Sequence, residues 1–137
     1  MAKTFELEIA TPERLLVKEQ VTEAQIPGAE GEMGVLRGHA PLLSRLGIGL
    51  LSYVAGGRRS FLVIADGIVE ILPDQVRVLA VRAEKPEEID TTRAEAAMKR
   101  AAERLQSPKE VLDYARAQSA LKRAQARVAA SERKPAG

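Results

Sequence analysis

The chain has 137 residues, of which 45% are hydrophobic and 29% charged, which indicates one globular domain or a small domain with an appendage. It has no cysteine, no apolar segment near the N-terminus and no run of about 18 apolar residues, so we expect no disulfide, thiolate metal site, secretory signal or membrane-spanning helix. The net charge is only +2, but it is unevenly distributed. Residues 1–89 carry 10 basic and 13 acidic side chains, and residues 90–137 carry 11 basic and 6 acidic side chains. This asymmetry predicts either an anionic partner for the C-terminal part or a solvated basic face.

The first part of the chain, up to about Ala83, alternates apolar and polar residues with the period of two that is typical of strands with one buried face. The alternating segments are residues 4–10, 21–26, 50–54, 60–66, 68–72 and 76–83. Turn signals such as Pro27-Gly28, Asp66-Gly67 and Pro73-Asp74 separate them at the spacing of roughly 8–12 residues expected of a small sandwich. No helical pattern interrupts these segments, so residues 1–84 are predicted to form an antiparallel β-sandwich rather than a parallel α/β sheet.

A polar, proline-containing linker at residues 85–88 leads into residues 89–137, where alanine dominates and glycine is absent until the last position. Apolar residues recur there at helical spacing and predict two helices. The face of the first helix consists of Ala94, Ala97, Met98, Ala101 and Leu105, and that of the second of Tyr114, Ala117, Leu121, Ala124 and Val128. The first helix begins either at Asp90 or at a capping box formed by Thr92 and Glu95, and Ser107-Pro108 starts the second.

The short joint between these helices predicts an antiparallel two-helix hairpin. Alanine favours each helix locally, but contacts between alanines bury little apolar area, and burial contributes roughly 25 cal/mol per Å². We therefore expect a hairpin whose helices are stable individually but weakly held to each other and to the sandwich, which is the property of a detachable arm.

The only histidine, His39, lies in the glycine-rich stretch GEMGVLRGHAPLL at residues 31–43. No serine and acid are placed to complete a catalytic triad, and Glu30 and Glu32 alone make a weak metal-ligand set with it. The glycines allow tight turns with positive φ. The stretch is interpreted as a system of rigid loops, which either only connects strands or forms a docking surface.

The longer stretch PGAEGEMGVLRGHAPLLSRLGIG resembles the signature of the epsilon subunit of bacterial rotary ATP synthase, called delta in mitochondria. The matching positions are Gly31, Glu32, Gly34, Gly38, His39, Ala40, Pro41, Leu42 and Leu43. The stretch DGIVEILPDQVRVLA at residues 66–80 resembles the last strands of that family, and DYARAQSALKRAQARV at residues 113–128 resembles its final helix. The resemblance covers essentially the whole chain in the same order.

This resemblance implies a sandwich of about ten strands followed by the helical hairpin, and a non-catalytic subunit with neither a metal nor a catalytic cofactor. It places the protein at the cytoplasmic face of the bacterial inner membrane, held there only through its complex. The sandwich is expected to bind the gamma subunit and the ring of c subunits, with Glu32 and His39 at these contacts. The hairpin is expected to extend along gamma into the alpha/beta hexamer and to inhibit ATP hydrolysis.

Six arginines are spaced so that three lie along one stripe of each predicted helix. They are Arg93, Arg100 and Arg104 on the first helix, and Arg116, Arg123 and Arg127 on the second. Such a stripe is either a solubilising face or a clamp for phosphate groups, because a guanidinium group donates several hydrogen bonds to phosphate oxygens.

The phosphate interpretation is favoured by IDTTRA at residues 89–94, which resembles the I/L-D-x-x-R-A motif of epsilon subunits that bind ATP between sandwich and folded hairpin. The resemblance implies nucleotide contacts at Glu84, Ile89, Asp90, Arg93, Ala94, Arg100, Arg116, Arg123 and Arg127. The sequence has no Gly-rich phosphate loop, so ATP is expected to be a regulatory ligand rather than a substrate. High ATP would stabilise the folded arm, and low ATP would let the arm extend.

Two other classes of function remain as alternatives. Basic alanine-rich helices could bind nucleic acid, but the chain lacks a recognisable nucleic-acid-binding signature and its sandwich half is acidic, so no nucleic-acid partner is expected. A small enzyme could use Glu30, Glu32 and His39. A steep salt dependence of DNA binding would favour the first alternative, and activity lost in His39→Ala would favour the second.

Overall fold

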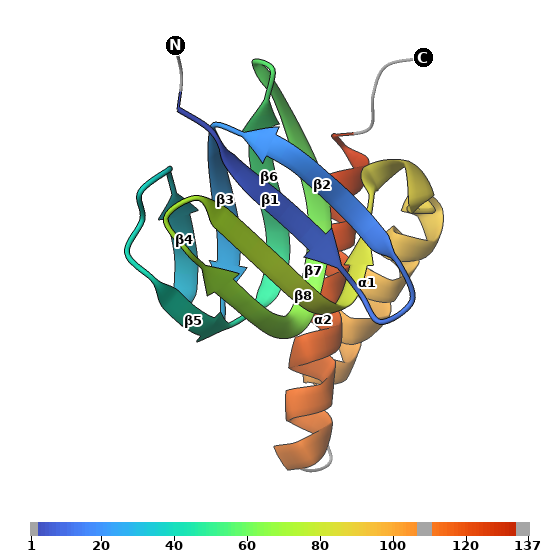
Figure 1. Cartoon of the computed structure of the whole chain (residues 1–137). Helices are drawn as coiled ribbons and strands as arrows, with labels where there is room; N and C mark the ends of the chain where they lie inside the picture. Colours follow the sequence, from blue (N-terminus) through green and yellow to red (C-terminus); the bar gives the residue numbers. More distant parts are fainter. Residues whose placement is uncertain (1–2, 107–110, 134–137) are drawn as a thin grey trace.

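The computed structural model describes residues 3–106 and 111–133, and within them it contains eight strands followed by two packed helices (Figure 1). The strands are β1 (Phe5–Ala10), β2 (Leu15–Val21), β3 (Glu23–Gly28), β4 (Gly31–Val35), β5 (Leu42–Arg45), β6 (Ile48–Ala55), β7 (Arg58–Ile71) and β8 (Gln75–Glu84). A single 3-10 turn, η1 (Pro86–Glu88), connects them to α1 (Thr91–Gln106) and α2 (Val111–Ser131). The predicted β-sandwich followed by two helices is confirmed, although the described residues form eight strands and not about ten.

The strands form one continuous sheet that folds over itself into two layers. Their order is β2-β1-β8-β7-β6-β3-β4, and β5 pairs with β7. All neighbouring pairs are antiparallel except β1 and β8, which are parallel. Figure 1 shows β1, β2 and β8 in the front layer and β3 and β6 behind them.

The dipeptide Asp66–Gly67 lies inside β7, so the turn predicted there is wrong. The core-facing side chains include Ile64 before the dipeptide and Val69 after it, which are an odd number of residues apart. The alternation therefore changes face at this point, and β7 passes from one layer of the sandwich to the other. The glycine has a φ of 124°, and a Cβ atom there would lie 2.1 Å from the carbonyl oxygen of Leu79. Only glycine fits this bend.

Part of the stretch interpreted as loops also forms strands. Gly31–Val35 pairs with β3 as β4, and Leu42–Arg45 pairs with β7 as β5, which leaves only residues 36–41 between them outside strands. These two strands are short, and most of their side chains are exposed. In β5 no residue is buried, so it shows no alternation of apolar and polar residues, whereas β4 alternates only through Met33 and Val35 and is too short to stand out from the glycine-rich stretch.

The core of the sandwich consists of branched and aromatic side chains from both layers. In β1 the alternating residues Phe5, Leu7 and Ile9 are all buried, as their pattern predicts. The largest fully buried side chains elsewhere in the sandwich are Ile26, Leu51, Leu62, Ile64 and Ile71. The sandwich therefore has a core of its own, independent of the helices.

The helices pack on the outer face of one layer. The α2 helix contacts β6 and β7, and α1 packs on α2 (Figure 1). The residue before α1 is Asp90, whose carboxylate accepts a hydrogen bond of 3.1 Å from the Arg93 backbone N–H, so the N-cap is Asp90 and not Thr92. Predicted cap residues Ser107 and Pro108 lie outside the described residues. Neither described helix is both long enough and apolar enough to cross a membrane.

Alanines make most of the buried surface of the helices. Ala101, Ala117 and Ala124 are buried on the hairpin, as the helical spacing predicts. A second set forms a small apolar cluster with the sandwich and consists of Ala94, Ala126, Ala130, Ile89 and Val63. The α2 helix thus has two alanine-rich faces, one toward α1 and one toward the sandwich.

Candidate functional site

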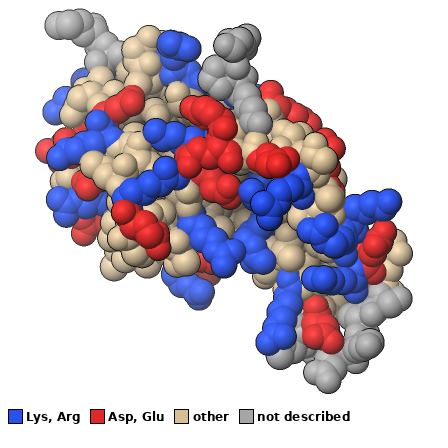
Figure 2. Space-filling view, turned by 90° about the vertical axis from the view of Figure 1, so that its right-hand side faces the viewer, with Lys and Arg blue, Asp and Glu red and all other residues tan. Residues whose placement is uncertain are grey.

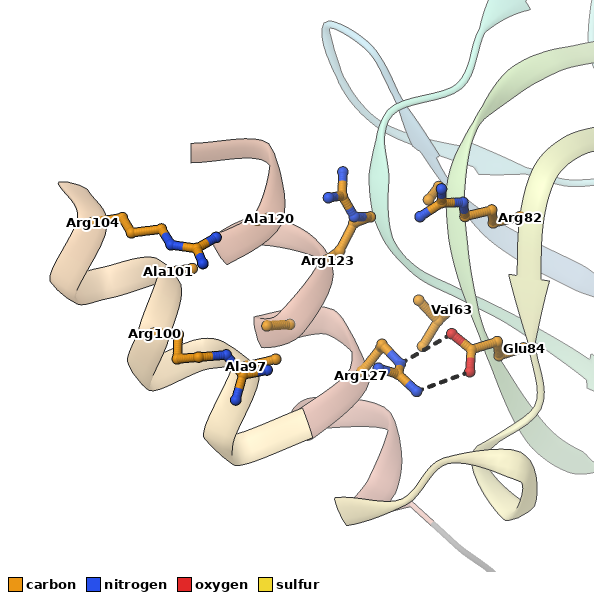
Figure 3. A pocket seen from close by; sticks show the side chains of 12 residues that line it. Val63, Arg82, Glu84, Ala97, Arg100, Ala101, Arg104, Ala120, Arg123 and Arg127 are labelled. Atoms are coloured by element: carbon orange, nitrogen blue, oxygen red, sulfur yellow. Dashed lines mark hydrogen bonds and ion pairs between the residues drawn. The ribbon is translucent and has the colours of Figure 1, made fainter. Parts of the chain in front are cut away.

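A cavity of about 270 Å³ lies where α1, α2 and the sandwich meet (Figure 3). We call it the arginine pocket. Its polar lining consists of Arg82 and Glu84 from β8, Arg100 and Arg104 from α1, and Arg123 and Arg127 from α2. Its apolar lining consists of Val63, Ala65, Ala97, Ala101, Ala120 and Ala124.

Regular spacing on three elements brings these polar side chains together. The arginines of each helix are four residues apart, so each pair shares one helix face. Arg82 and Glu84 are two residues apart at the end of β8, so they share one face of the sheet. Figure 3 shows Arg100 and Arg104 extending from α1 toward α2, and Arg82 extending from the sandwich toward Arg123.

One ion pair crosses the pocket from the sandwich to α2. The Arg127 Nε atom lies 3.0 Å from Glu84 Oε1, and Nη2 donates a hydrogen bond of 3.3 Å to Oε2. The Nε atom is buried but makes no well-directed hydrogen bond, despite its short distance to the carboxylate. The ion pair therefore leaves part of the hydrogen-bonding capacity of Arg127 unused.

The other four arginines of the pocket make no ion pair within residues 3–106 and 111–133. Five cations thus surround one carboxylate. Figure 2 shows Lys and Arg side chains gathered on the helical lobe and at its junction with the sandwich. The electrostatic character of this junction favours an anion with several charged oxygens.

The structure brings together four of the nine predicted nucleotide-contact residues, namely Glu84, Arg100, Arg123 and Arg127. The other five lie elsewhere. Ile89 and Ala94 are buried in the small apolar cluster, Asp90 caps α1, Arg116 lines a separate depression beside Arg123, and Arg93 is outside the pocket lining.

Two of the six polar lining residues, Arg82 and Arg104, were not among the predicted contacts. Arg104 belongs to the arginine stripe of the first helix, which already placed it beside Arg100. For Arg82 the sequence gives a weaker indication. It lies two residues before Glu84 on a strand, and this spacing alone predicts that the two side chains share one face of the sheet.

The loop at residues 36–41 lies on the side of the sandwich away from α1 (Figure 1). The Gly38 N–H donates a hydrogen bond of 2.7 Å to the Pro73 carbonyl oxygen, which ties this loop to the β7–β8 turn. His39 is half-buried, and its Nδ1 atom lies 2.6 Å from the Ala40 carbonyl oxygen. Glu32 is exposed at the start of β4. Among the described residues no three His, Asp or Glu side chains are grouped as metal ligands.

The outer face of the front layer is uncovered and partly apolar. Its large exposed side chains are Leu15, Leu43, Ile68, Leu79 and Val81, and we call this surface the open face. Ile68 pairs directly with Leu79, and Leu79 pairs with Ala10, which is itself opposite Leu15. These residues therefore form a row across four strands, and contiguous apolar surface of this kind marks an interaction site.

Two further contacts attach the helices to the sandwich. At the hinge, Glu88 Oε2 accepts a hydrogen bond of 2.6 Å from Arg14 Nη2, and Glu88 Oε1 accepts one of 3.0 Å from the Lys85 backbone N–H. Burial raises the pKa of Glu88, but these interactions outweigh it and lower the pKa below its ordinary value. At the far end of α2, the Arg133 guanidinium lies 4.7 Å from the centre of the Phe61 ring.

Comparison with known proteins gives matches over nearly the whole chain. Residues 4–86 match the family described as ATP synthase, Delta/Epsilon chain, beta-sandwich domain, and residues 87–132 match ATP synthase, Delta/Epsilon chain, long alpha-helix domain. The ATP synthase epsilon chain of Solibacter usitatus is 52% identical over 98% of this chain and 100% of its own length. That of Syntrophobacter fumaroxidans is 47% identical over 97% and 99%.

Solved structures give the same result. A chain in the mitochondrial ATP synthase of Euglena gracilis, solved with OSCP, F1 and the c-ring, aligns with a TM-score of 0.80 and 28% identity, covering 94% of this chain and 81% of that chain. A chain in the central stalk and c-ring of the Tetrahymena thermophila mitochondrial ATP synthase shares the fold, with a TM-score of 0.64 and 11% identity over 94% of this chain and 97% of that chain.

Proposed function

The chain belongs to the delta/epsilon family of ATP synthase subunits, and from this membership we propose that it couples the c-ring to gamma and that its helical arm regulates ATP hydrolysis. It is a non-catalytic subunit of a complex that links proton transport to ATP synthesis, so the small-enzyme alternative is wrong. Its proposed place is the cytoplasmic face of the bacterial inner membrane, where the complex holds it.

The sandwich is the part that docks on the rotor. The open face offers an apolar surface to gamma. Glu32 and His39 lie on the side of the sandwich that faces away from α1, and they are proposed to contact gamma or the c-ring. The hydrogen bond from Gly38 to Pro73 supports this role, because it fixes the backbone next to His39 before a partner binds.

The arm is the part that inhibits. Its contacts with the sandwich are made by a small apolar cluster rich in alanine and by two ion pairs, one of them partly buried, so separating the two costs little compared with unfolding either. The released arm would extend along gamma into the alpha/beta hexamer and oppose hydrolysis. Its basic side chains would then meet acidic groups of that hexamer.

ATP in the arginine pocket is the proposed gate. The observation that carries this proposal is the convergence of arginines from β8, α1 and α2 on one cavity at the junction of arm and sandwich. An anion bound there contacts all three elements only while the arm is folded. It therefore stabilises the folded arm by its affinity for that state alone.

Isothermal titration of the whole chain with ATP, with and without magnesium, tests the gate. We expect saturable binding at micromolar to low millimolar ATP and a rise in the melting temperature. Arg100→Ala and Arg123→Ala should each weaken binding by about tenfold or more, because a charge-assisted hydrogen bond contributes about 1.5–3 kcal/mol. Arg77→Ala, on the opposite face of β8, is the control. No heat at millimolar ATP would refute the gate and leave the docking role intact.

Binding to an ATP synthase complex from which the native epsilon subunit has been removed tests the docking role. We expect Glu32→Gln and His39→Ala to weaken binding by about tenfold each, as residues near the centre of an interface do. Glu103→Gln, exposed on α1, is a matched control on the other side of the molecule. Unchanged binding of both sandwich variants would place the contact elsewhere.

A further inference from the structure

The open face and the hinge of the arm are joined by one short segment of chain. The turn between β1 and β2 consists of residues 11–14 and lies on the side of the sandwich that carries α1 (Figure 1). Leu15 begins β2 directly after this turn, is 54% exposed and belongs to the open face. The last residue of the turn is Arg14, whose Nη2 donates a hydrogen bond of 2.6 Å to Glu88 Oε2 in η1. A residue of the open face and a residue that holds the hinge are therefore neighbours in the chain.

The β8 strand connects the same two regions a second time. Val81 lies on the open face with 57% exposure, and the strand ends three residues later, just before the hinge. Because β1 and β8 are parallel neighbours, they leave the open face in the same direction, one into the turn and the other toward η1. A partner that covers Leu15 and Val81 thus restrains both segments that carry the Arg14–Glu88 contact.

The backbone around this contact is already fixed, whereas one of its side chains is not. The Thr11 N–H donates a hydrogen bond of 2.9 Å to the Arg14 carbonyl oxygen and closes the turn. Glu88 Oε1 accepts a hydrogen bond of 3.0 Å from the Lys85 N–H, which orients the carboxylate. The long Arg14 side chain remains 47% exposed.

Exposure is what keeps this ion pair weak in the free chain. Water screens the two charges, and the arginine side chain loses rotamer freedom when the pair forms. Both effects become smaller when a partner excludes water beside Arg14 and holds the turn in place. The η1 turn leads into α1 after two residues, so a hinge held against the sandwich also sets the direction in which the arm leaves it.

We propose that the β1–β2 turn couples the open face to the arm: a partner bound to the open face strengthens the Arg14–Glu88 contact and thereby favours the folded arm. Arg14 is the positioning residue of this coupling. The proposal rests on the docking of the sandwich on the rotor that is proposed above. Because coupling between two sites is reciprocal, the partner also binds a chain with the intact hinge contact more tightly than a chain without it, by the same factor.

A double-mutant cycle of binding tests the coupling. The unmodified chain, Arg14→Gln, Glu88→Gln and the double variant are each titrated into an ATP synthase complex from which the native epsilon subunit has been removed. We expect each single variant to bind about fivefold more weakly, and the double variant to bind no more weakly than either single one. Weaker binding of Glu88→Gln is the decisive result, because Glu88 lies in the hinge and outside the open face. Arg58→Gln, exposed at the start of β7, is the matched control and should bind like the unmodified chain.

Hydrogen exchange shows where the coupling acts. Binding to the same complex should slow exchange of the amides of η1 and of the first turn of α1 by about fivefold in the unmodified chain. The same amides should show no such slowing in Arg14→Gln, because that variant lacks the connection between the turn and the hinge.

One further variant separates failure of the coupling from failure of the docking. Leu79→Ser places a hydroxyl group within the open face and should weaken binding whether or not the hinge responds. Unchanged binding of Leu79→Ser would refute docking through the open face. Weaker binding of Leu79→Ser and Arg14→Gln together with unchanged binding of Glu88→Gln would mean that Arg14 contacts the partner directly, which would overturn the coupling alone. Faster exchange of η1 on binding would mean that the partner draws Arg14 away from Glu88, and this would overturn the coupling as well.

Discussion

The sandwich and the helical arm are built on different packing principles. In the sandwich, side chains such as Leu7, Ile9 and Ile64 are completely buried, so each contributes a large apolar area. In α1 and α2, the buried described residues are Ser131 and alanines, among them Ala101 and Ala130, whose side chains are single methyl groups. The sandwich therefore has the larger apolar core, and the proposed release of the arm rests on the smaller apolar contacts that attach it.

The arm compensates for its small apolar contacts with polar ones at three points. These are the pair Arg127–Glu84 in the pocket, the pair Arg14–Glu88 at the hinge, and Arg133 over the Phe61 ring. The exposed pair Arg14–Glu88 contributes about 0–1 kcal/mol, and the contact of Arg133 with the Phe61 ring adds about 0.5–1 kcal/mol, so neither of these two fixes the arm alone. A ligand that adds hydrogen bonds at one of these points can decide the position of the arm.

Truncation of the sandwich core should have the largest effect. Ile64→Ala removes a fully buried side chain and should lower the free energy of unfolding by about 2–5 kcal/mol. Ile68→Ala, on the same strand but 44% exposed, is the control and should cost much less. Urea unfolding followed by circular dichroism measures both. Equal losses of unfolding free energy in the two variants would contradict the assignment of Ile64 to the core and of Ile68 to the exposed face of β7.

Enlargement of an arm contact should have a smaller and local effect. Ala130→Leu forces a larger side chain into the fully buried contact between α2 and the sandwich, at a cost of about 1–3 kcal/mol. We expect faster amide hydrogen exchange in α1 and α2 and unchanged exchange in β1 and β8. Ala115→Leu, exposed on α2, is the matched control. Faster exchange throughout the sandwich would show that arm and sandwich unfold as one unit.

Removal of the helix cap should affect only α1. Asp90→Ala removes the acceptor of the Arg93 N–H and should destabilise the start of α1 by about 0.5–2 kcal/mol. Thr92→Ala tests the competing cap at the same helix end and should have little effect. Hydrogen exchange of the first-turn amides distinguishes the two. A larger effect for Thr92→Ala would favour the capping box of Thr92 and Glu95, which the sequence also allowed.

Local sequence patterns predicted those parts of the fold that depend on neighbours in the chain. The alternation in β1 identified a buried face correctly. The helical spacing identified the buried Ala94, Ala101, Ala117 and Ala124, but it also placed Tyr114 on a buried face, and that side chain is 46% exposed. The bend at Asp66–Gly67 was misread as a turn, because the same dipeptide serves either purpose and only the approach of Leu79 from another strand decides between them. The short strand β5 has no alternation to detect, and in β4 it is limited to Met33 and Val35.

The candidate site shows the same limit. Arg100 with Arg104, and Arg123 with Arg127, could be grouped from helical spacing. Arg82 could not be assigned to them, because its approach to α2 depends on how the arm lies against the sandwich. That arrangement is a property of the tertiary packing, and no local pattern encodes it.

The hinge should give the smallest effect, and it depends on pH. The folded state lowers the pKa of Glu88, so this group contributes stability above the ordinary glutamate pKa of 4.5, and the contribution is lost as the pH falls through the lowered value. Its side chain is 36% exposed, so the contribution should be below about 1 kcal/mol. Glu88→Gln should therefore be slightly less stable than the unmodified chain at pH 7, and the difference should shrink as the pH is lowered toward 3.

Urea unfolding at the two pH values, with Glu103→Gln as the control, measures this difference. Hydrogen exchange at pH 7 shows where it acts, since a contact between the hinge and the β1–β2 turn should protect η1 and the start of α1 rather than the sandwich core. A difference that persists at pH 3 would mean that the Glu88→Gln substitution disturbs the hinge through the shape of the new side chain and not through the lost charge. A difference in hydrogen exchange spread over the core strands would mean that the hinge unfolds together with the sandwich. The boundary between the sandwich and the proposed movable arm would then lie after Glu88.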